Sequence, residues 1–334
     1  MKQLTLKERN YIEFALTLDT PISKIALHLG RDRSTIYREI KRNSMPKGKK
    51  STLAQYPYQA TSANNCAKLR KRKVVTKTKA TKGLIKRILH YLNLKFSPEQ
   101  IVHGAPNINV SVGTIYNWID KQIIPFDKKK LRLKGKRVRK RKEAGRLLSR
   151  PDSSWFIQHS IDNRPIECKH RIEFGHWEAD SVLSRRGSNA AIATFIERKT
   201  RQYLAFKMPD KTSHSMYQAI KRLIKLYPSA IKSITCDRGT EFINQTYVAK
   251  LEKKGIKIYI AHAYSPQERG SNENHNGLLR EYFPKGVDFQ NVSQKELNQA
   301  VHAINNRPRK TLNWKTATDH FQKEIQRKKR KKLV

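Results

Sequence analysis

Three acidic residues stand where an α/β sheet would place its chemistry. Asp180 lies in the middle of a strand-like segment at 175–183, where an unpaired carboxylate is costly. Asp237 directly follows a short apolar strand, and ligand sites of open α/β sheets lie at the carboxyl ends of strands. Glu273 lies in the first turn of a helix that begins after Gly270. Carboxylates brought together repel one another, so this set predicts a site for magnesium or manganese, which prefer oxygen ligands.

Two such ions about 3.5–4 Å apart would activate a nucleophile and stabilise a leaving oxygen during phosphodiester cleavage.

Other kinds of active site have weaker support in the sequence. Cys168, His170 and His176 lack the spacing of a zinc site, so isolated hydrogen-bonded side chains are the better interpretation. The 13 tyrosines include no candidate nucleophile with a matching Arg-His-Arg arrangement. A phosphate loop of the G-x-x-x-x-G-K-[ST] type is absent, which predicts no nucleotide cofactor.

The composition predicts a polyanionic partner. Among the 334 residues, 71 Lys and Arg stand against 27 Asp and Glu, and the formal net charge is +44. Neutralised phosphates release counterions and drive binding, so nucleic acid is the expected partner. No run approaches the roughly 18 apolar residues of a membrane span, and the N-terminal residues lack an apolar signal core. Three widely spaced cysteines suit a reducing cytoplasm, the expected location.

The charge is unevenly distributed along the chain. Residues 1–150 hold 37 basic and 9 acidic residues, a net charge of +28. Residues 151–334 hold 34 basic and 18 acidic residues, a net charge of +16. This division predicts a DNA-binding front part and a back part that uses carboxylates.

The front part contains a predicted helix-turn-helix domain at 1–45. Thr5 and Glu8 form a capping-box pattern before a periodic apolar run, and Gly30 ends a second short helix. A third helix begins at Ser34 or Thr35, with Ile36, Tyr37 and Ile40 available for packing. This helix would enter a major groove. Its predicted DNA-facing residues are Arg33, Ser34, Thr35, Arg38 and Lys41.

A second helix-turn-helix-like domain is predicted at 83–125. Ser97, Pro98 and Gln100 have the pattern of an N-cap, a first-turn proline and a capping-box partner. On its last helix, the residues that share one face are Thr114, Asn117 and Lys121, all predicted to contact DNA. Basic linkers are expected at 46–82 and 126–163, and a basic tail at 323–334.

The back part has the pattern of a mixed α/β sheet. Strands are predicted at 175–183, 189–196, 201–207, 231–236 and 256–260, with a turn at 197–200 between the second and third. Helices are predicted at 214–227 and 242–254, after Gly270, and at 295–305. The order β-β-β-α-β-α-β-α-α indicates a sheet with helices on its faces, at 164–322.

The acidic motifs resemble those of the DDE transposase and retroviral integrase superfamily. The second and third acids lie 36 positions apart, and the motifs are W-x-x-D ending at Asp180, CDRGTEF beginning at Cys236, and SP-(x)3-G-(x)2-E ending at Glu273. More narrowly, the chain is similar to the IS-thirty family of bacterial insertion-sequence transposases. The stretches that carry this likeness are GHWEAD, ERKTR, DRGTEF, YSPQERGSNENHNGLLREYFPKG, NNRPRKTLNWKTATDHF and the N-terminal helix-turn-helix, so it covers most of the chain. Ala179, Gln267 and Glu268 depart from the usual pattern without removing an acid.

The resemblance implies a multidomain transposase. All-α helix-turn-helix domains would precede a catalytic core with the RNase H-like integrase fold. Asp180, Asp237 and Glu273 would hold two magnesium or manganese ions, and water and then a DNA 3′-hydroxyl would attack phosphodiesters. The partners would be double-stranded DNA, as terminal inverted repeats and target, and further copies of the chain, at least a dimer. The setting would be the nucleoid of a bacterial cytoplasm.

Arg280 is a further residue that the sequence predicts to contact DNA. It lies seven positions after Glu273, on the same helix face, where its cation could hold a phosphate of the cleaved strand; an ordinary surface arginine is the alternative. Two rival functions also stay open: a helix-turn-helix repressor with an inactive back part, and a structural basic protein of the RNA- or ribosome-binding type. The presence of all three acids argues against the repressor, and the paired helix-turn-helix patterns argue against the structural protein.

Overall fold

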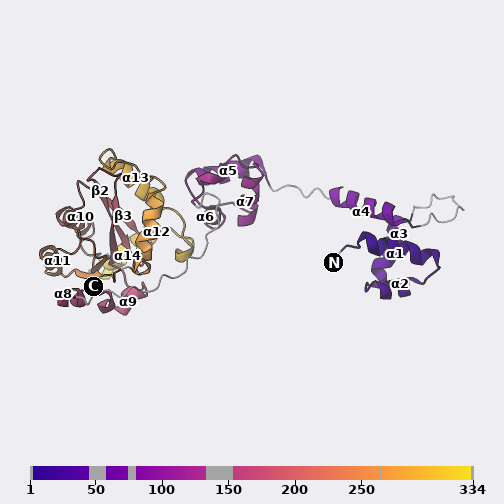
Figure 1. The fold of residues 1–334 in the computed structure, drawn as a ribbon, viewed down its shortest axis with the longest axis horizontal. Coiled ribbons are helices and arrows are strands. Elements are labelled where there is room, and N and C mark those ends of the chain that lie inside the picture. The colour runs from indigo at the N-terminus through magenta and orange to yellow at the C-terminus, as the bar shows by residue number, and fades with distance from the viewer. Residues whose placement is uncertain (1–2, 45–57, 74–79, 133–152, 264, 332–334) are drawn as a thin grey trace. The chain divides into compact units, whose positions relative to one another are not determined.

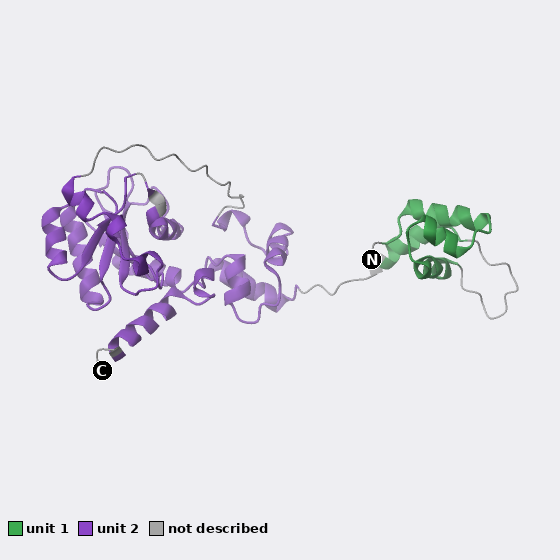
Figure 2. Ribbon diagram, turned by 90° about the horizontal axis from the view of Figure 1, so that it is seen from below, with its two compact units in different colours: residues 1–79 green, residues 80–334 purple. Residues whose placement is uncertain are grey.

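The protein divides into two compact units, residues 1–79 and residues 80–334 (Figure 2). The structure is a computed structural model that describes residues 3–44, 58–73, 80–132, 153–263 and 265–331. Much of both predicted linkers and the end of the predicted basic tail lie outside the described residues. Among the described residues, no helix is long and apolar enough to cross a membrane.

The first unit is a small helical domain. Its helices are α1 (Leu6–Thr17), α2 (Ile22–His28), α3 (Arg33–Asn43) and α4 (Ala60–Lys73). The predicted capping box is present, because Thr5 and Glu8 exchange hydrogen bonds at the start of α1. The fully buried residues of its core are Ile12, Ile25 and Ile36. Tyr37 was expected to pack, but it is 53% exposed; Ile36, about 100° away around the helix, fills the core instead.

A buried ion pair positions α3 within this unit. Arg9 on α1 donates from Nε to Glu39 Oε1 on α3 at 2.7 Å, and both side chains are buried. Arg9 also donates from Nη1 to the carbonyl oxygen of Leu4 at 2.6 Å. Buried charges are stable only when paired and hydrogen-bonded, so this pair holds α3 in one orientation against α1. The exposed face of α3 is thereby fixed relative to the rest of the unit.

Residues 80–132 form a second helical group with its own apolar core. Its helices are α5 (Lys82–Asn93), α6 (Pro98–Gly104) and α7 (Val112–Asp120), followed by a 3₁₀ turn, η1 (Lys128–Lys130). The predicted capping box of α6 is present: Gln100 N donates to Ser97 Oγ at 3.2 Å, and Ser97 N donates to Gln100 Oε1 at 2.9 Å. Residues of all three helices meet in its core, at Ile88, Ile101 and Ile115.

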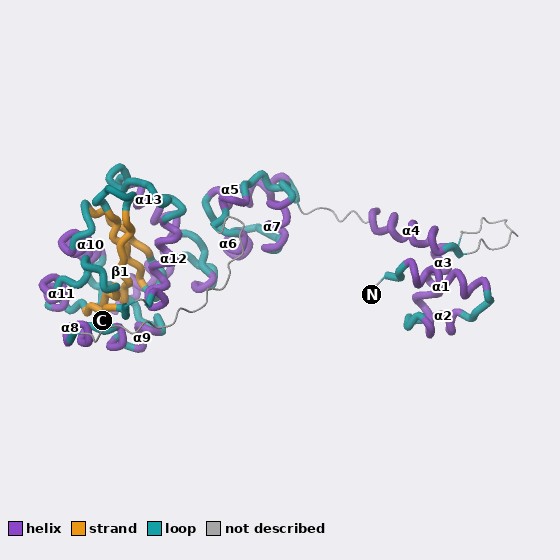
Figure 3. Tube along the Cα trace, in the orientation of Figure 1, coloured by secondary structure: helices purple, strands orange, loops and turns teal. Residues whose placement is uncertain are grey.

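The region predicted at 164–322 is built on a five-stranded mixed sheet (Figure 1, Figure 3). The strands are β1 (His176–Leu183), β2 (Ala191–Glu197), β3 (Tyr203–Met208), β4 (Ser233–Cys236) and β5 (Lys257–Ile260). Their order across the sheet is β3-β2-β1-β4-β5. The pairs β1–β2 and β2–β3 are antiparallel, whereas β1–β4 and β4–β5 are parallel. All five strands match the predicted segments to within a few residues.

Helices cover both faces of the sheet. One apolar cluster packs α10 (Ser213–Leu226), α11 (Gln245–Glu252) and α14 (Ala317–Lys331) against one face. A second cluster packs α12 (Gly270–Leu279) and α13 (Gln294–Asn305) against the other face. Figure 1 shows α10 and α11 on one side of the strands and α12 and α13 on the other. The shorter elements are α8 (Ser154–Gln158), η2 (Ile161–Asn163), α9 (Ile166–Lys169), η3 (Pro266–Arg269) and η4 (Lys310–Leu312).

Helical structure extends beyond the predicted elements in three places. Helix α4 lies within the predicted linker 46–82, and α8 and η2 lie within the predicted linker 126–163. Helix α14 covers most of the predicted basic tail. Phe321 anchors α14 in the core with 1% exposure, and its ring lies 5.9 Å from that of Trp177. Phe321 thus anchors a helix whose later residues are mostly charged. Because those later residues are charged, the composition of residues 323–334 predicted a basic tail rather than part of a packed helix.

Candidate active site and nucleic-acid interfaces

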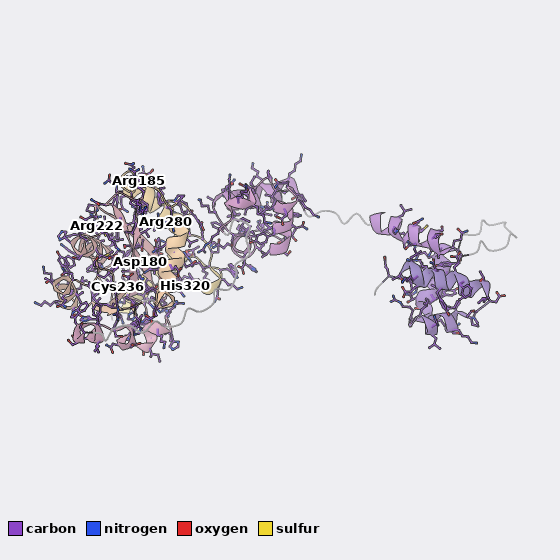
Figure 4. The ribbon with its side chains drawn as sticks, in the orientation of Figure 1. Asp180, Arg185, Arg222, Cys236, Arg280 and His320 are labelled. Carbon is purple, nitrogen blue, oxygen red and sulfur yellow. The ribbon has the colours of Figure 1, made fainter. Side chains whose placement is uncertain are left out.

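The parallel pairing of β1 with β4 brings two of the three predicted acids together. Glu178 pairs with Thr235 in the register of these strands. Two residues further along each strand, Asp180 stands beside Asp237, at the end of β4. Figure 4 labels Asp180 on β1 and Cys236, the residue before Asp237, within the sheet. Two like charges are therefore adjacent because of the sheet topology, although 57 positions separate them in the sequence.

Arg269 bridges these two carboxylates. Its Nη2 donates to Asp237 Oδ2 at 2.8 Å, and its Nη1 lies 3.4 Å from Asp180 Oδ1. The side chain of Arg269 is 16% exposed, so the pairing is partly shielded from solvent. Its guanidinium occupies the position between the carboxylates that a bound cation would take. Arg269 was not predicted from the sequence, although it lies inside the motif that ends at Glu273.

Further hydrogen bonds orient the two carboxylates. Asn276 donates from Nδ2 to Asp180 Oδ2 at 2.9 Å, and the backbone N–H of Gly239 donates to Asp237 Oδ1 at 2.9 Å. A Cβ at position 239 would lie 2.5 Å from Glu241 Oε2 and 2.9 Å from Asp237 Oδ1, so any other residue here would force these carboxylates to shift. Burial raises the pKa of the Asp180 carboxyl above its ordinary value, and Arg269 opposes that rise. The cationic Arg269 therefore favours the charged form of Asp180.

Glu273, the third predicted acid, lies on α12 at the border of this site. It is four positions after Arg269 and three before Asn276, so helical spacing places it on the face that contacts β1. Its side chain is exposed. The start of α12 is anchored beneath it, because Glu178 Oε2 accepts a hydrogen bond from the backbone N–H of Asn272 at 3.3 Å.

The donor set fits a divalent cation once Arg269 moves aside. Asp180 and Asp237 already share one cationic group, and carboxylate oxygens are the ligands that magnesium and manganese prefer. Within the described residues, no group of three or more His, Cys, Asp or Glu side chains is arranged to hold a metal ion. The structure thus brings together two of the three predicted ligands, with Glu273 on the adjacent helix face.

A fourth acid, Glu241, lies next to the pair. Ser181 Oγ donates to Glu241 Oε1 at 2.7 Å, and Lys211 Nζ lies 3.3 Å from the same oxygen. The other oxygen of Glu241 is buried without a hydrogen-bond partner among the described residues. The sequence places Glu241 in the motif of Asp237, but only the fold shows that it contacts the strand of Asp180.

The weak zinc candidates do not form a cluster. His176 hydrogen-bonds to Ser233 Oγ at 2.7 Å through Nδ1 and to Glu173 Oε2 at 2.6 Å through Nε2. Cys168 is a buried free thiol whose pKa is raised by burial. His170 is exposed. His176 is thus a hydrogen-bonded side chain, and the three residues form no metal cluster within the described part of the chain.

The predicted DNA-facing residues of the front part lie on accessible helix faces. On α3, Arg33, Ser34, Arg38 and Lys41 are exposed and Thr35 is half-buried. On and just after α7, Asn117 and Lys121 are exposed and Thr114 is half-buried. Thr114 N donates to Ser111 Oγ at 3.1 Å, which caps the start of α7. These positions satisfy the access that DNA contact requires, and their contacts with DNA stay a prediction.

Arg280 follows directly after α12 and contacts Leu183 at the end of β1 and the ring of Phe289. Its Nη2 donates to the carbonyl oxygen of Leu183 at 2.6 Å, and its guanidinium lies 5.4 Å from the ring centre of Phe289 (Figure 4). These contacts tie the end of α12 to the end of β1. A phosphate contact by Arg280 stays a prediction.

Two family models match the chain. Residues 1–43 match the helix-turn-helix domain, and residues 170–266 match the integrase core domain. The chain is 34% identical to the "Probable transposase for insertion-like sequence element IS1161" of Streptococcus salivarius, over 96% of this chain and 94% of that relative. It is 32% identical to the "Transposase InsI for insertion sequence element IS30C" of Escherichia coli K12, over 96% of this chain and 84% of that relative.

Weaker likenesses are to solved structures of retroviral integrases. The catalytic core domain of BIV integrase is 18% identical, with a TM-score of 0.39, covering 47% of this chain and 99% of that one. The HTLV-2 integrase catalytic core domain, solved in complex with magnesium in a trimeric form, is 18% identical with a TM-score of 0.36. That match covers 43% of this chain and 94% of the HTLV-2 chain.

The Arg269 bridge predicts a coupling between this arginine and divalent cations. Without metal, Arg269→Gln should lower the melting temperature, because charge-assisted hydrogen bonds contribute about 1.5–3 kcal/mol each. Magnesium or manganese should then stabilise Arg269→Gln more than the unaltered chain, where an ion must displace the guanidinium. Differential scanning fluorimetry across a metal titration measures both effects. Arg327→Gln, which removes an exposed arginine of α14, is the control. Identical melting curves for Arg269→Gln and the unaltered chain at every metal concentration would contradict the prediction.

The contacts of His262 predict that the stability of the protein depends on pH. His262 Nδ1 bonds Glu268 Oε1 at 2.8 Å and Nε2 bonds Asp162 Oδ2 at 2.9 Å. The hydrogen bond to Glu268 and the nearby carboxylates raise the pKa of His262 above 6.5. Its contribution to stability is complete below the unfolded-state pKa of about 6.5 and is lost as the pH rises through the raised folded-state pKa.

His262→Gln should therefore destabilise the protein most near pH 6, and the difference should shrink as the pH rises above the folded-state value. Thermal unfolding at half-unit pH steps measures it. His170→Gln, at an exposed histidine, serves as the control. A difference that grows with pH would mean that the histidine is stabilised in its neutral form.

Proposed function

The chain belongs to the IS30 family of insertion-sequence transposases, and we propose that it binds the terminal inverted repeats of its element and catalyses metal-dependent strand cleavage and strand transfer. Family membership supports a DNA-cutting and DNA-joining enzyme with an integrase core. The finer proposal concerns which DNA is bound, which residues act and how the ends are joined.

The observation that carries the proposal is the convergence of Asp180 and Asp237 on one cationic group. Such a pair is expensive to maintain without a cation, because burial already disfavours the charged form of Asp180. A purely DNA-binding repressor would have no use for two adjacent carboxylates in a strongly basic protein. Their retention at a strand end, beside a helix that carries Glu273, favours catalysis.

Magnesium or manganese, proposed at two ions per site, would supply a polarised nucleophile and neutralise the leaving oxygen. The chain's own residues would prepare the site. Asp180, Asp237 and Glu273 would provide the oxygen ligands. Asn276 and the Gly239 backbone N–H hold the two aspartates in fixed orientations, so fewer side-chain motions are required on binding.

DNA recognition would be divided between the two parts of the chain. The exposed face of α3 would read the terminal repeats in a major groove, and the face of α7 would add contacts. The core would bind the scissile strand and, later, the target duplex. Joining two ends requires two sites, so we propose at least a dimer on DNA. No step uses a nucleotide cofactor.

Removing the charge of either aspartate should separate cleavage from binding. Asp237→Asn and Asp180→Asn keep the side-chain shape but lose a ligand charge. Each should reduce cleavage of end-bearing DNA in magnesium by more than the roughly 10–100-fold cost of losing an outer-shell group. End binding in a mobility-shift assay should stay unchanged. Asp319→Asn, at an exposed aspartate of α14, is the control.

The same assay tests the rival function. A repressor would bind ends equally well in all three variants and show no cleavage in the unaltered chain with either magnesium or manganese. Full cleavage by Asp237→Asn would instead remove the metal-ligand assignment while leaving the family membership intact.

End recognition should depend on α3. Replacing Arg33, Arg38 and Lys41 together by Gln should weaken binding to the terminal repeats and flatten its salt dependence, by about 0.9 in the log–log slope for each lost phosphate contact. Binding across a salt series measures this. Lys7→Gln, which removes an exposed cation of α1, should change the slope little. An unchanged slope and affinity in the triple variant would place recognition elsewhere.

A further inference from the structure

Arginine side chains gather near the start of α12, where four of them share three carboxylates. Arg164, Arg171 and Arg201 each interact electrostatically with Arg198 and with Glu178, while Glu268 and Glu197 add negative charge beside Arg164 and Arg201. Arg198 pairs with Glu178 Oε1 in the interior, where Glu178 is fully buried. The other oxygen of Glu178 accepts the Asn272 N–H. Both oxygens of Glu178 therefore already have partners, Arg198 and the backbone N–H at the start of α12.

Two of these arginines meet at one hydroxyl group. Arg201 Nη1 donates to Ser271 Oγ at 2.9 Å, and Arg171 Nη2 donates to the same oxygen at 3.3 Å. Within the part of the chain that the structure describes, neither arginine forms a salt bridge. Burial and then the charge of Arg171 lower the pKa of Arg201 to about 10. Two cations that converge on a neutral oxygen leave a position that favours an anion.

The backbone at both arginines is held in an uncommon conformation. Arg171 has φ 61° and Arg201 has φ 64°, in the left-handed region that non-glycine residues rarely adopt. Arg171 follows α9, and Arg201 lies in the turn between β2 and β3. Glycine or asparagine would adopt either conformation more easily. Strained residues of this kind gather at functional sites, and here both direct a guanidinium to the same point.

Buried polar groups without hydrogen-bond partners among the described residues occur on the same part of α12 as Ser271. Asn272 is fully buried, and both polar atoms of its side-chain amide lack a hydrogen-bond partner among the described residues. His275, 2% exposed, bonds the Ser271 carbonyl through Nδ1 at 2.7 Å, while its Nε2 has no such partner. Burial and the charges of Arg309 and Arg201 lower the pKa of His275. The start of α12 thus combines free polar groups, excess positive charge and the positive end of a helix dipole.

We propose that Arg171, Arg201 and Ser271 form a binding site for a phosphate of the DNA backbone. The inference rests on the proposed function, because it takes the transposon or target strand as the source of that phosphate. Arg171 is exposed, so a strand can approach from its side, while Arg201 is half-buried and fixes the position of the anion. Ser271 and Glu273 share the first turn of α12 but point to different sides of the helix, because residues two positions apart do not face each other. The site would therefore hold a phosphate beside the first turn of the helix that carries Glu273 and set the register of the strand.

This site is tested with the full chain by replacing single DNA phosphates and single arginines, first separately and then together. In a duplex carrying the terminal repeat, each phosphate near the cleavage position is replaced in turn by a neutral methylphosphonate. For the unaltered chain, one replacement should weaken binding by about tenfold, the effect of one lost charge-assisted contact of about 1.4 kcal/mol. In Arg171→Gln and in Arg201→Gln, that same replacement should cause no further loss.

Arg222→Gln is the matched control, because Arg222 is exposed on α10, which packs on the opposite face of the sheet from α12. In this variant, the methylphosphonate should cost as much as in the unaltered chain. Arg171→Gln alters an exposed side chain, so it tests the site even if Arg201→Gln fails to fold. Arg171→Lys should retain part of the sensitivity, since it keeps the charge but loses the forked donors.

The outcomes separate this inference from the proposed function. If every methylphosphonate weakens binding equally in Arg171→Gln and the unaltered chain, the phosphate site is wrong, even when the unaltered chain cleaves unmodified DNA. If inorganic phosphate raises the melting temperature of the unaltered chain but not of Arg171→Gln, while the methylphosphonate series shows no coupling, the site binds free anions and the DNA assignment is overturned. If the unaltered chain fails to cleave, the proposed function fails, whatever the binding series shows.

Discussion

The parallel contact between β1 and β4 imposes the constraint on which the rest of the core depends. It places Asp180 and Asp237 side by side, in a setting where burial already raises the pKa of the Asp180 carboxyl. Two adjacent carboxylates in a folded core require a positive partner. Arg269 supplies one from η3, the turn that leads into α12, so the loop and the helix are bound to the sheet through the two carboxylates that we propose as metal ligands.

Helix α12 is held against β1 along its whole length. Glu178 accepts a hydrogen bond at the start of the helix, Asn276 contacts Asp180 at its middle, and Arg280 bonds the carbonyl of Leu183 just after it. The helix therefore runs along β1 with a polar contact at each turn, and Leu279 is fully buried against the sheet. Glu273 is carried on this helix with an exposed side chain. The contacts of α12 therefore fix the backbone of Glu273, which we propose as the third metal ligand.

Positive charge serves two different purposes in this protein. On α3 the basic side chains are exposed and spaced along one helix face, as expected for groups that exchange water and counterions for phosphates. Elsewhere, Arg9 in the first unit and Arg198 and Arg269 in the second are paired with specific carboxylates and hold elements together. Composition alone reports only the total of +44, and it gives no means to tell these two groups apart.

Local patterns determined much of this protein before any tertiary contact is considered. The capping boxes at Thr5 and Ser97 depend on interactions within four residues, and both are present. The five strands and their intervening helices follow from apolar periodicity, and the acidic motifs indicated the integrase core. Tertiary structure alone decided the rest. The bridge of Arg269 to Asp180 and the meeting of Arg171 with Arg201 join residues far apart in the sequence. Such contacts depend on strand order and helix packing, whose long-range geometry no local pattern encodes.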